Sequence, residues 1–255
     1  MAWTSRKKLA FVAAAAVMGY TTYLLWPLSV DQRVQRLLQE LADQPTDPFD
    51  FNFSRHPDDI FADFDGLGTK AVPGLIAELR DPRIAMRYLA AGQIGKIRDC
   101  RAVEPLLAEL NDEEVVVRVW AIEALGRIGD KRAVDALIPL LRYGDSSVRC
   151  QAAQALGTLG DKRAYESLLP LVHDNEIYPR HHAVEALGNL GDQRAVNVLL
   201  GVLANDNDTW VQSAAILGLS QLGDTRAIPM IKKADSSDWK IRDAVKEALS
   251  RFKQK

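Results

Sequence analysis

Residues 124–134 read Ala-Leu-Gly-Arg-Ile-Gly-Asp-Lys-Arg-Ala-Val, and close variants of this phrase recur along the chain. A fixed period of this kind is the signature of a stacked repeat array, in which no unit buries its apolar face alone. The sequence therefore predicts a solenoid. The alanine near the end of the phrase recurs every 31 residues, with one final step of 32, at Ala71, Ala102, Ala133, Ala164, Ala195 and Ala227.

Each phrase has the features of one helix ending and another beginning. Gly129 can take the positive φ of a helix C-cap, and the Asp130 carboxylate can accept hydrogen bonds from the free amides of the next helix. Between the phrases, apolar residues such as Ile122 and Leu125 recur at helical spacing, and nothing here alternates with period two. Each unit is therefore predicted to be two helices. Small alanines that would let neighbouring units approach closely stand at positions 90, 121, 152 and 183.

The repeated unit resembles the short HEAT-like repeat named after phycobilisome lyases. The residues that carry the resemblance are Gly-Asp-x-Arg-Ala-Val, then Val-Arg, then Ala-Leu-Gly. The resemblance covers residues 59–255 and implies an all-α, right-handed α-solenoid of about six two-helix repeats. It also implies that the second helices line a concave face, where such proteins bind partners. Residues 58–68 are similar to a lone second helix that covers the first unit, and the polar residues 251–255 suit the opposite end.

Ahead of the repeats, residues 9–28 carry no charge, and these 20 residues would form a helix of about 30 Å, enough to cross a bilayer. Three basic residues at 6–8 precede them, and basic residues stay on the cytoplasmic side. The sequence thus predicts a single-pass membrane protein, with a cytoplasmic tail at 1–8 and the solenoid outside the cytoplasm, in the periplasm if bacterial. A cleaved signal peptide is the alternative, because residues 13–16 are alanines.

Residues 29–58 connect the predicted anchor to the repeats. Apolar residues at helical spacing over 30–41 predict a stalk helix, and prolines after it predict an irregular linker. Phe49, Phe51 and Phe53 alternate within that linker, and we expect them to pack against the first unit. Addition of this segment as a strand to a partner is the alternative.

Charge disfavours a nucleic-acid partner. The net charge is −2, and without the three basic residues before Leu9 the chain has 29 basic and 34 acidic residues. A nucleic-acid-binding protein is expected to carry a basic stripe. The arginine of each Arg-Ala-Val phrase recurs at one position of the repeat, so we expect it to hold the turn between units.

Catalytic motifs are weak. His181 and His182 with Glu185 place imidazole and carboxylate one helical turn apart, an arrangement that could offer two metal ligands. A metal site needs three or four ligands. We therefore favour surface histidines without metal and expect no cofactor. The histidine pair resembles the His-Glu pairs of deoxyhypusine hydroxylase, yet the glutamate after the histidine is absent.

A bilin-lyase-like function is a further alternative, with Trp120, Tyr178, Trp210 and Trp239 beside a tetrapyrrole. Cys100 and Cys150 fall in different helix layers, too far apart to form a disulfide.

The favoured function is a membrane-tethered scaffold that binds a protein partner on the concave face, with a lyase or hydroxylase type of enzyme as the alternative. On the second helices, residues at i, i+3 and i+7 off the apolar stripe share one side and vary between units. An ordinary solvated face is the competing interpretation. The predicted binding residues are Trp120, Glu123, Arg127, Gln151, Gln154, Thr158, His182, Glu185 and Asn189.

Overall fold

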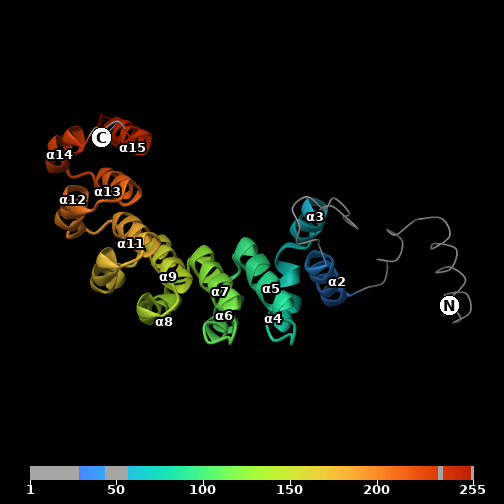
Figure 1. The fold of residues 1–255 in the computed structure, drawn as a ribbon. Helices are drawn as coiled ribbons and strands as arrows, with labels where there is room; N and C mark the ends of the chain where they lie inside the picture. The colour runs from blue at the N-terminus through green and yellow to red at the C-terminus, as the bar shows by residue number, and fades with distance from the viewer. Residues whose placement is uncertain (1–28, 44–56, 235–237, 254–255) are drawn as a thin grey trace, which may run out of the picture.

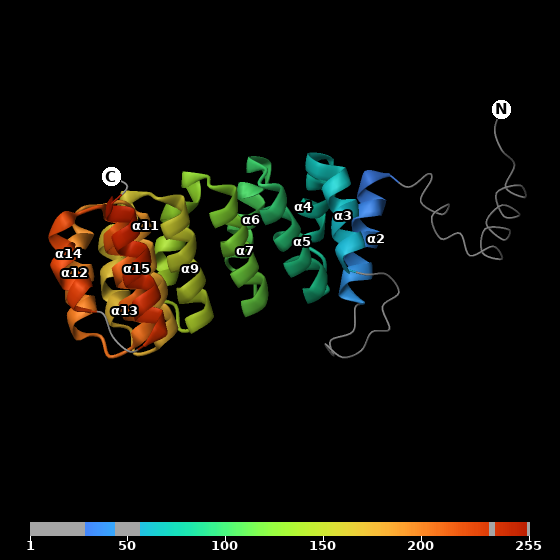
Figure 2. The same cartoon turned by 90° about the horizontal axis from the view of Figure 1, so that it is seen from above.

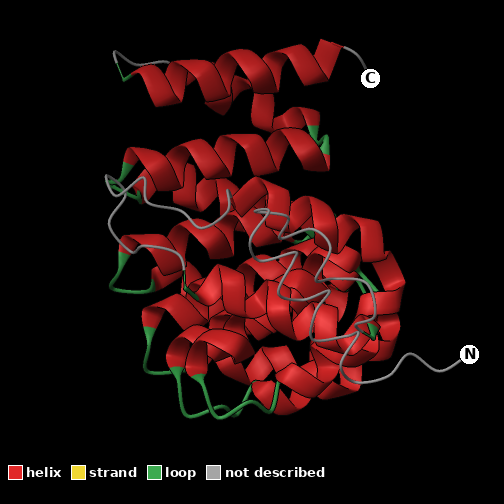
Figure 3. Cartoon of the chain, turned by 90° about the vertical axis from the view of Figure 1, so that its right-hand side faces the viewer, coloured by secondary structure: helices red, strands yellow, loops and turns green. Residues whose placement is uncertain are grey.

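The computed structural model describes residues 29–43, 57–234 and 238–253. Within these ranges the secondary structure is helical and includes no strand (Figure 3). The helices stack side by side into an arc that runs from α2 to α15 (Figure 1), and Figure 2 shows the same array from above. The prediction of an all-helical solenoid of two-helix repeats is confirmed.

Helix pairs follow one another from residue 72 to residue 253. Figure 1 shows the second helix of each pair on the inner, concave side of the arc and the first helix outside it. The first helices are α4 (Val72–Glu78), α6 (Val103–Glu109), α8 (Val134–Leu137), α10 (Tyr165–Leu168), α12 (Ala195–Asn205) and α14 (Ile228–Lys233). The second helices are α5 (Ile84–Ile97), α7 (Val115–Ile128), α9 (Ser146–Leu159), α11 (Ile177–Asn189), α13 (Thr209–Leu222) and α15 (Trp239–Lys253).

Short 3₁₀ turns complete the pairs. Pro139 and Pro170 each lie in a 3₁₀ turn that follows a one-turn helix, because proline lacks the amide hydrogen that would continue the α-helical hydrogen bonds. These two turns are η5 (Ile138–Arg142) and η7 (Leu169–His173). The turns before first helices are η2 (Gly68–Ala71), η3 (Cys100–Ala102), η4 (Lys131–Ala133), η6 (Lys162–Ala164) and η8 (Thr225–Ala227).

Helix α2 (Val30–Ala42) covers the N-terminal end of the array. Ser29 begins it with a capping box: its hydroxyl accepts from the Gln32 amide, and the Gln32 side chain accepts from the Ser29 amide. Leu37 and Leu38 are buried where α2 packs on α3 (Pro57–Leu67), α4 and α5. The helix predicted as a stalk is therefore present but lies on the repeats. Phe49, Phe51 and Phe53 are outside the described residues.

The structure corrects the predicted localisation. A single-pass membrane protein was expected from residues 9–28, which lie outside the described part of the chain. Among the helices that the structure does describe, none combines the length and the apolar composition needed to cross a membrane. The expected transmembrane helix and the membrane tether are therefore without support.

Successive second helices approach closely at glycine. A Cβ added to Gly126 would lie 2.9 Å from the Cβ of Ala155, and one added to Gly157 would lie 2.7 Å from the Cα of Ala186. Real Cβ atoms do not come so near to a backbone atom, so these positions require glycine. The alanines predicted to permit close approach are fully buried, but the first glycine of each Ala-Leu-Gly phrase makes the tightest contact. The repeat pattern did not predict this role of the glycines.

The junctions between units have the predicted chemistry. Gly129 ends α7 with a φ of 81°, and the Asp130 side chain then accepts a hydrogen bond from the Arg132 amide. The Arg132 guanidinium also pairs with Asp130, at 2.7 Å, and reaches Glu104 of the previous unit, at 3.2 Å. The arginine of this phrase therefore holds the turn between units. Arg98 stands where the later units have glycine and takes a φ of 60°.

A second set of arginines joins neighbouring units through the loops before the second helices. Nε of Arg87 donates to Asp112 of the next unit, at 2.7 Å, and Arg149 and Arg180 repeat this bond to Asp174 and Asp206. We call these residues, together with Arg118, the arginine ladder. Arg118 has no such carboxylate: its guanidinium lies over the Tyr143 ring, 5.1 Å from the centroid, and its buried Nε makes no hydrogen bond.

Replacing Gly157 with alanine should lower the melting temperature. The new methyl group meets a backbone atom of α11, and overpacking of this kind costs about 1 to 3 kcal/mol. Gly201→Ala is the matched control, because Gly201 is helical with nothing within 4 Å of an added Cβ. That variant should gain roughly 0.5 to 1 kcal/mol from helix propensity. Equal effects of the two variants in thermal unfolding would contradict the close approach.

Tyr143→Asp should stabilise the chain by completing the arginine ladder. A carboxylate at residue 143 would accept from Nε of Arg118, and the gain of about 1.5 to 3 kcal/mol for such a bond exceeds the lost cation–π contact of about 1 kcal/mol. Chemical unfolding of the wild type and the variant measures the difference. Tyr143→Asn is the control without charge, and equal stability of the Asn and Asp variants would contradict the assignment.

Candidate binding face

The nine predicted binding residues lie on α7, α9 and α11, three to a helix. These helices pack side by side on the concave side of the arc (Figure 1), so the structure brings the three sets onto one surface. None of the nine is buried. Trp120, Glu123, Gln151 and His182 are half-buried, whereas Arg127, Gln154, Thr158, Glu185 and Asn189 are exposed.

Trp120 is less available than the sequence suggested. Its ring stacks on that of Tyr88, with centroids 6.5 Å apart and planes at 24°. It also lies over Gly92, where an added Cβ would come within 3.2 Å of the indole ring. Trp120 therefore packs flat across α5, with only part of its surface open to a partner.

Exposed aromatic side chains lie one helical turn before the predicted stripe. Tyr178 precedes His182 by four residues, so it shares that face of α11, and its side chain is 66% exposed. Trp210 takes the corresponding place at the start of α13 and is 47% exposed, and Trp239 begins α15 and is 61% exposed. We call these three residues the aromatic row. From the sequence, these three residues were considered only beside a tetrapyrrole, because the predicted protein-binding stripes began at His182 on α11 and did not extend to α13 or α15.

A lysine bridges two members of the aromatic row. Nζ of Lys240 lies 5.8 Å from the centroid of the Trp210 ring and 5.3 Å from that of Trp239. Cation–π contacts at exposed sites contribute about 0.5 to 1 kcal/mol each. Because α11, α13 and α15 are successive second helices in contact, the row runs along one edge of the concave face.

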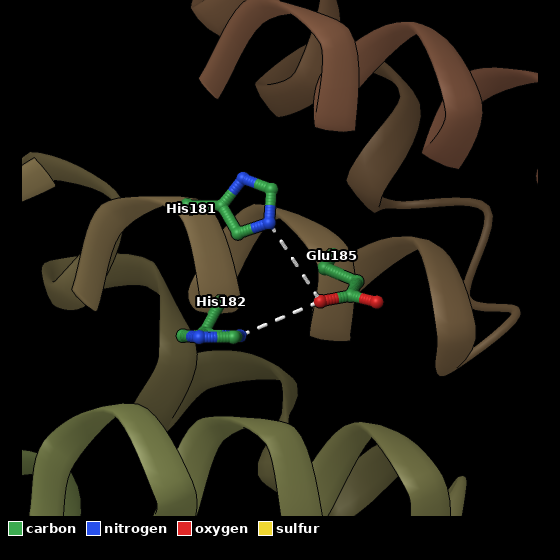
Figure 4. Close-up of side chains that lie close together, drawn as sticks. All are labelled: His181, His182 and Glu185. Carbon is green, nitrogen blue, oxygen red and sulfur yellow. Dashed lines mark ion pairs between the residues drawn. The ribbon is translucent and has the colours of Figure 1, made fainter. Parts of the chain in front are cut away.

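Next to the row, His181, His182 and Glu185 converge on α11 (Figure 4). Nε2 of His181 lies 4.0 Å from Oε2 of Glu185, and Nδ1 of His182 lies 3.4 Å from the same oxygen. Nδ1 of His181 is 3.3 Å from the carbonyl oxygen of Trp210, and the His181 ring meets the Trp210 ring edge to face. Nδ1 of His182 is buried and makes no hydrogen bond.

The surroundings shift the pKa values of two of these groups. Burial lowers the pKa of His181, and the neighbouring His182 lowers it further. Contact with the His182 ring lowers the pKa of Glu185, so this side chain is a carboxylate. Within the described residues, this is the one group of three or more candidate ligand residues close enough together to hold a metal ion.

Other candidate sites are less suited to binding. A hollow of about 410 Å³ lies between the loops of the third and fourth units, and three of its charged residues, Arg149, Asp174 and Glu176, pair with one another. Cys100 and Cys150 are free thiols, as predicted. Burial raises the pKa of Cys150 to about 11, so this thiol is protonated and unreactive at neutral pH.

The repeats match a known family. The family model described as HEAT repeats matches residues 72–142, 103–178 and 166–250. No curated protein matches the chain significantly.

Solved structures share the fold. Kap121p bound to Pho4p is similar with a TM-score of 0.68 and 15% identity, over 88% of this chain and 29% of that one. An engineered protein has a TM-score of 0.51 and 22% identity, over 72% of this chain and 96% of its own. The complex of CpcE and CpcF of phycocyanin lyase from Nostoc sp. has a TM-score of 0.48 and 24% identity, over 72% and 94%. At these identities the first two likenesses, with TM-scores above 0.5, are evidence of fold alone.

Proposed function

The chain belongs to the HEAT repeat family, and from that premise we propose that it is a scaffold whose concave face binds a partner protein. The observation that carries the proposal is the exposed aromatic row beside a stripe of varied polar side chains. The proposed face consists of the nine predicted residues and, at one edge, Tyr178, Trp210 and Trp239.

The composition of this face favours a protein as the partner. Large aromatic side chains dominate the energetics of protein interfaces, especially where polar groups surround them. Within the described residues, the second helices expose three large aromatic side chains, those of Tyr178, Trp210 and Trp239. Packing within the array does not account for their exposure. The polar stripe beside them differs from unit to unit, which gives the face a pattern that a specific partner can match.

Other classes of function have less support. The arginines of the repeated phrase are engaged by Asp130 and its equivalents, so they do not form the free basic stripe that a nucleic-acid partner requires. A lyase or hydroxylase function has no comparable support, because the solved structures that suggest it show likeness of fold alone.

Replacing Tyr178, Trp210 and Trp239 together with alanine should reduce partner recovery at least about tenfold, because each truncated anchor typically costs more than 1 kcal/mol of binding. Crosslinking of the full chain in its native cells, followed by quantitative mass spectrometry, measures the recovery. The melting temperature should change little, since the three side chains are exposed.

Met230→Ala is the matched control, because Met230 is an exposed apolar residue on α14, a first helix outside the concave face. It should leave recovery unchanged. Equal recovery by the wild type and the triple variant would move the binding site away from the aromatic row, and loss in Met230→Ala would move it to the outer layer.

A further inference from the structure

We propose that His181, His182 and Glu185 bind one Zn²⁺ ion on the concave side of α11. The three side chains present two imidazole nitrogens and a carboxylate oxygen, all within 4.8 Å of one another. This inference rests on the geometry of one helix and does not depend on the proposed partner. It also departs from the expectation of unliganded surface histidines.

The spacing of the donor atoms suits a tetrahedral ion. Zn²⁺ bonds to nitrogen and oxygen are about 2.0 to 2.2 Å long, which places two ligands of one tetrahedral ion roughly 3.4 Å apart. Nδ1 of His182 and Oε2 of Glu185 are already at this separation, 3.4 Å, and Nε2 of His181 is 4.0 Å from the same oxygen. Small side-chain rotations bring the third donor into place, since His181 and Glu185 are separated by one helical turn.

Trp210 orients the first histidine for metal binding. The carbonyl oxygen of Trp210 can only accept, so Nδ1 of His181, 3.3 Å away, carries the ring proton, and Nε2 faces Glu185. Histidines that ligate metals almost always donate their other ring N–H in this way, which fixes the tautomer and the ring orientation. The edge-to-face contact with the Trp210 ring holds His181 further.

The second histidine offers a ring nitrogen to the same space. Nδ1 of His182 is buried and meets no hydrogen-bond geometry, and Oε2 of Glu185 lies 3.4 Å from it. The lone pair of His181 and the charge of Glu185 face the same space. Two imidazole nitrogens and one carboxylate oxygen therefore converge there, and a single cation can bind all three.

The donor set favours a transition-metal ion such as Zn²⁺ over Ca²⁺ or Mg²⁺ and leaves one position open. Two imidazoles and one carboxylate suit Zn²⁺, whereas Ca²⁺ and Mg²⁺ prefer oxygen ligands alone. Three protein ligands leave the fourth tetrahedral position to an outside ligand, on the face where Glu185 is exposed. Stacking of the repeats does not require these residues, because the corresponding pairs in other units are Val119-Trp120, Cys150-Gln151 and Ser213-Ala214.

Titration of the chelator-treated full chain with Zn²⁺ in a calorimeter tests the proposal. We expect one ion per chain and a rise in melting temperature with added Zn²⁺.

His182→Ala and Glu185→Gln should each weaken binding at least about tenfold, since even changes to the partners of metal ligands cost 10- to 100-fold. Both variants should melt at the wild-type temperature without metal. Co²⁺ added in place of Zn²⁺ should give the absorption spectrum of a tetrahedral site.

His173→Ala is the matched control, because His173 is an exposed histidine on η7 that does not belong to the cluster. It should bind Zn²⁺ as the wild type does. Absence of saturable binding to the wild type, or equal binding by His182→Ala, would overturn the proposal. No partner is present in this titration, so its failure leaves the scaffold function untouched. The titration uses chains with Trp210 intact, so it is independent of the partner recovery measured with the aromatic variant.

Discussion

The close approach of successive second helices at glycine is the contact on which the rest of the array depends. Where Gly157 meets Ala186, backbone lies on backbone, so no side chain can adjust the distance between the two units. Repetition of this contact sets the spacing of the concave face. The longer side chains of each second helix then project at fixed intervals, and this regularity is what lets residues from three or four helices act as one surface.

The contacts that hold the units together also leave that surface free to vary. Capping aspartates and ladder arginines satisfy charge and backbone groups at the ends of the helices, and the core alanines and leucines fill the space between the layers. Neither set includes the outward positions of α11. A histidine pair can therefore replace Cys150-Gln151 or Val119-Trp120 at the same place in the repeat without disturbing the packing.

Much of the fold could be predicted from the sequence, because its determinants are local. Gly129 ends one helix and Asp130 caps the next through hydrogen bonds to residues a few positions away. The repeated phrase at 124–134 contains these residues, so their roles could be predicted from it. The role of Gly157 could not be read in this way, since the atom that excludes a side chain belongs to the next unit.

The sequence could group the residues of one helix side, but it could not predict their exposure. The i, i+3, i+7 residues of α11 do share one side of that helix, whereas exposure depends on neighbours: Trp120 is covered by packing on Tyr88, and Tyr178 is open at the start of its own helix. The His181 tautomer likewise depends on a carbonyl of the following unit. The charge-free segment at 9–28 shows the limit of composition, because hydropathy alone led to a localisation that the structure does not support.

The gap in the arginine ladder at Arg118 has a mechanical consequence. The second and third units lack the ion pair that Arg87, Arg149 and Arg180 provide at their own joints. Each repeat contacts only its neighbours, so a force that bends the solenoid acts on every joint between repeats. The joint with the weakest contacts then deforms most. A bend of the arc is therefore expected to be larger at this joint than at the three joints that carry the ion pair, and it would change the distance between the Trp120 side of the arc and the aromatic row.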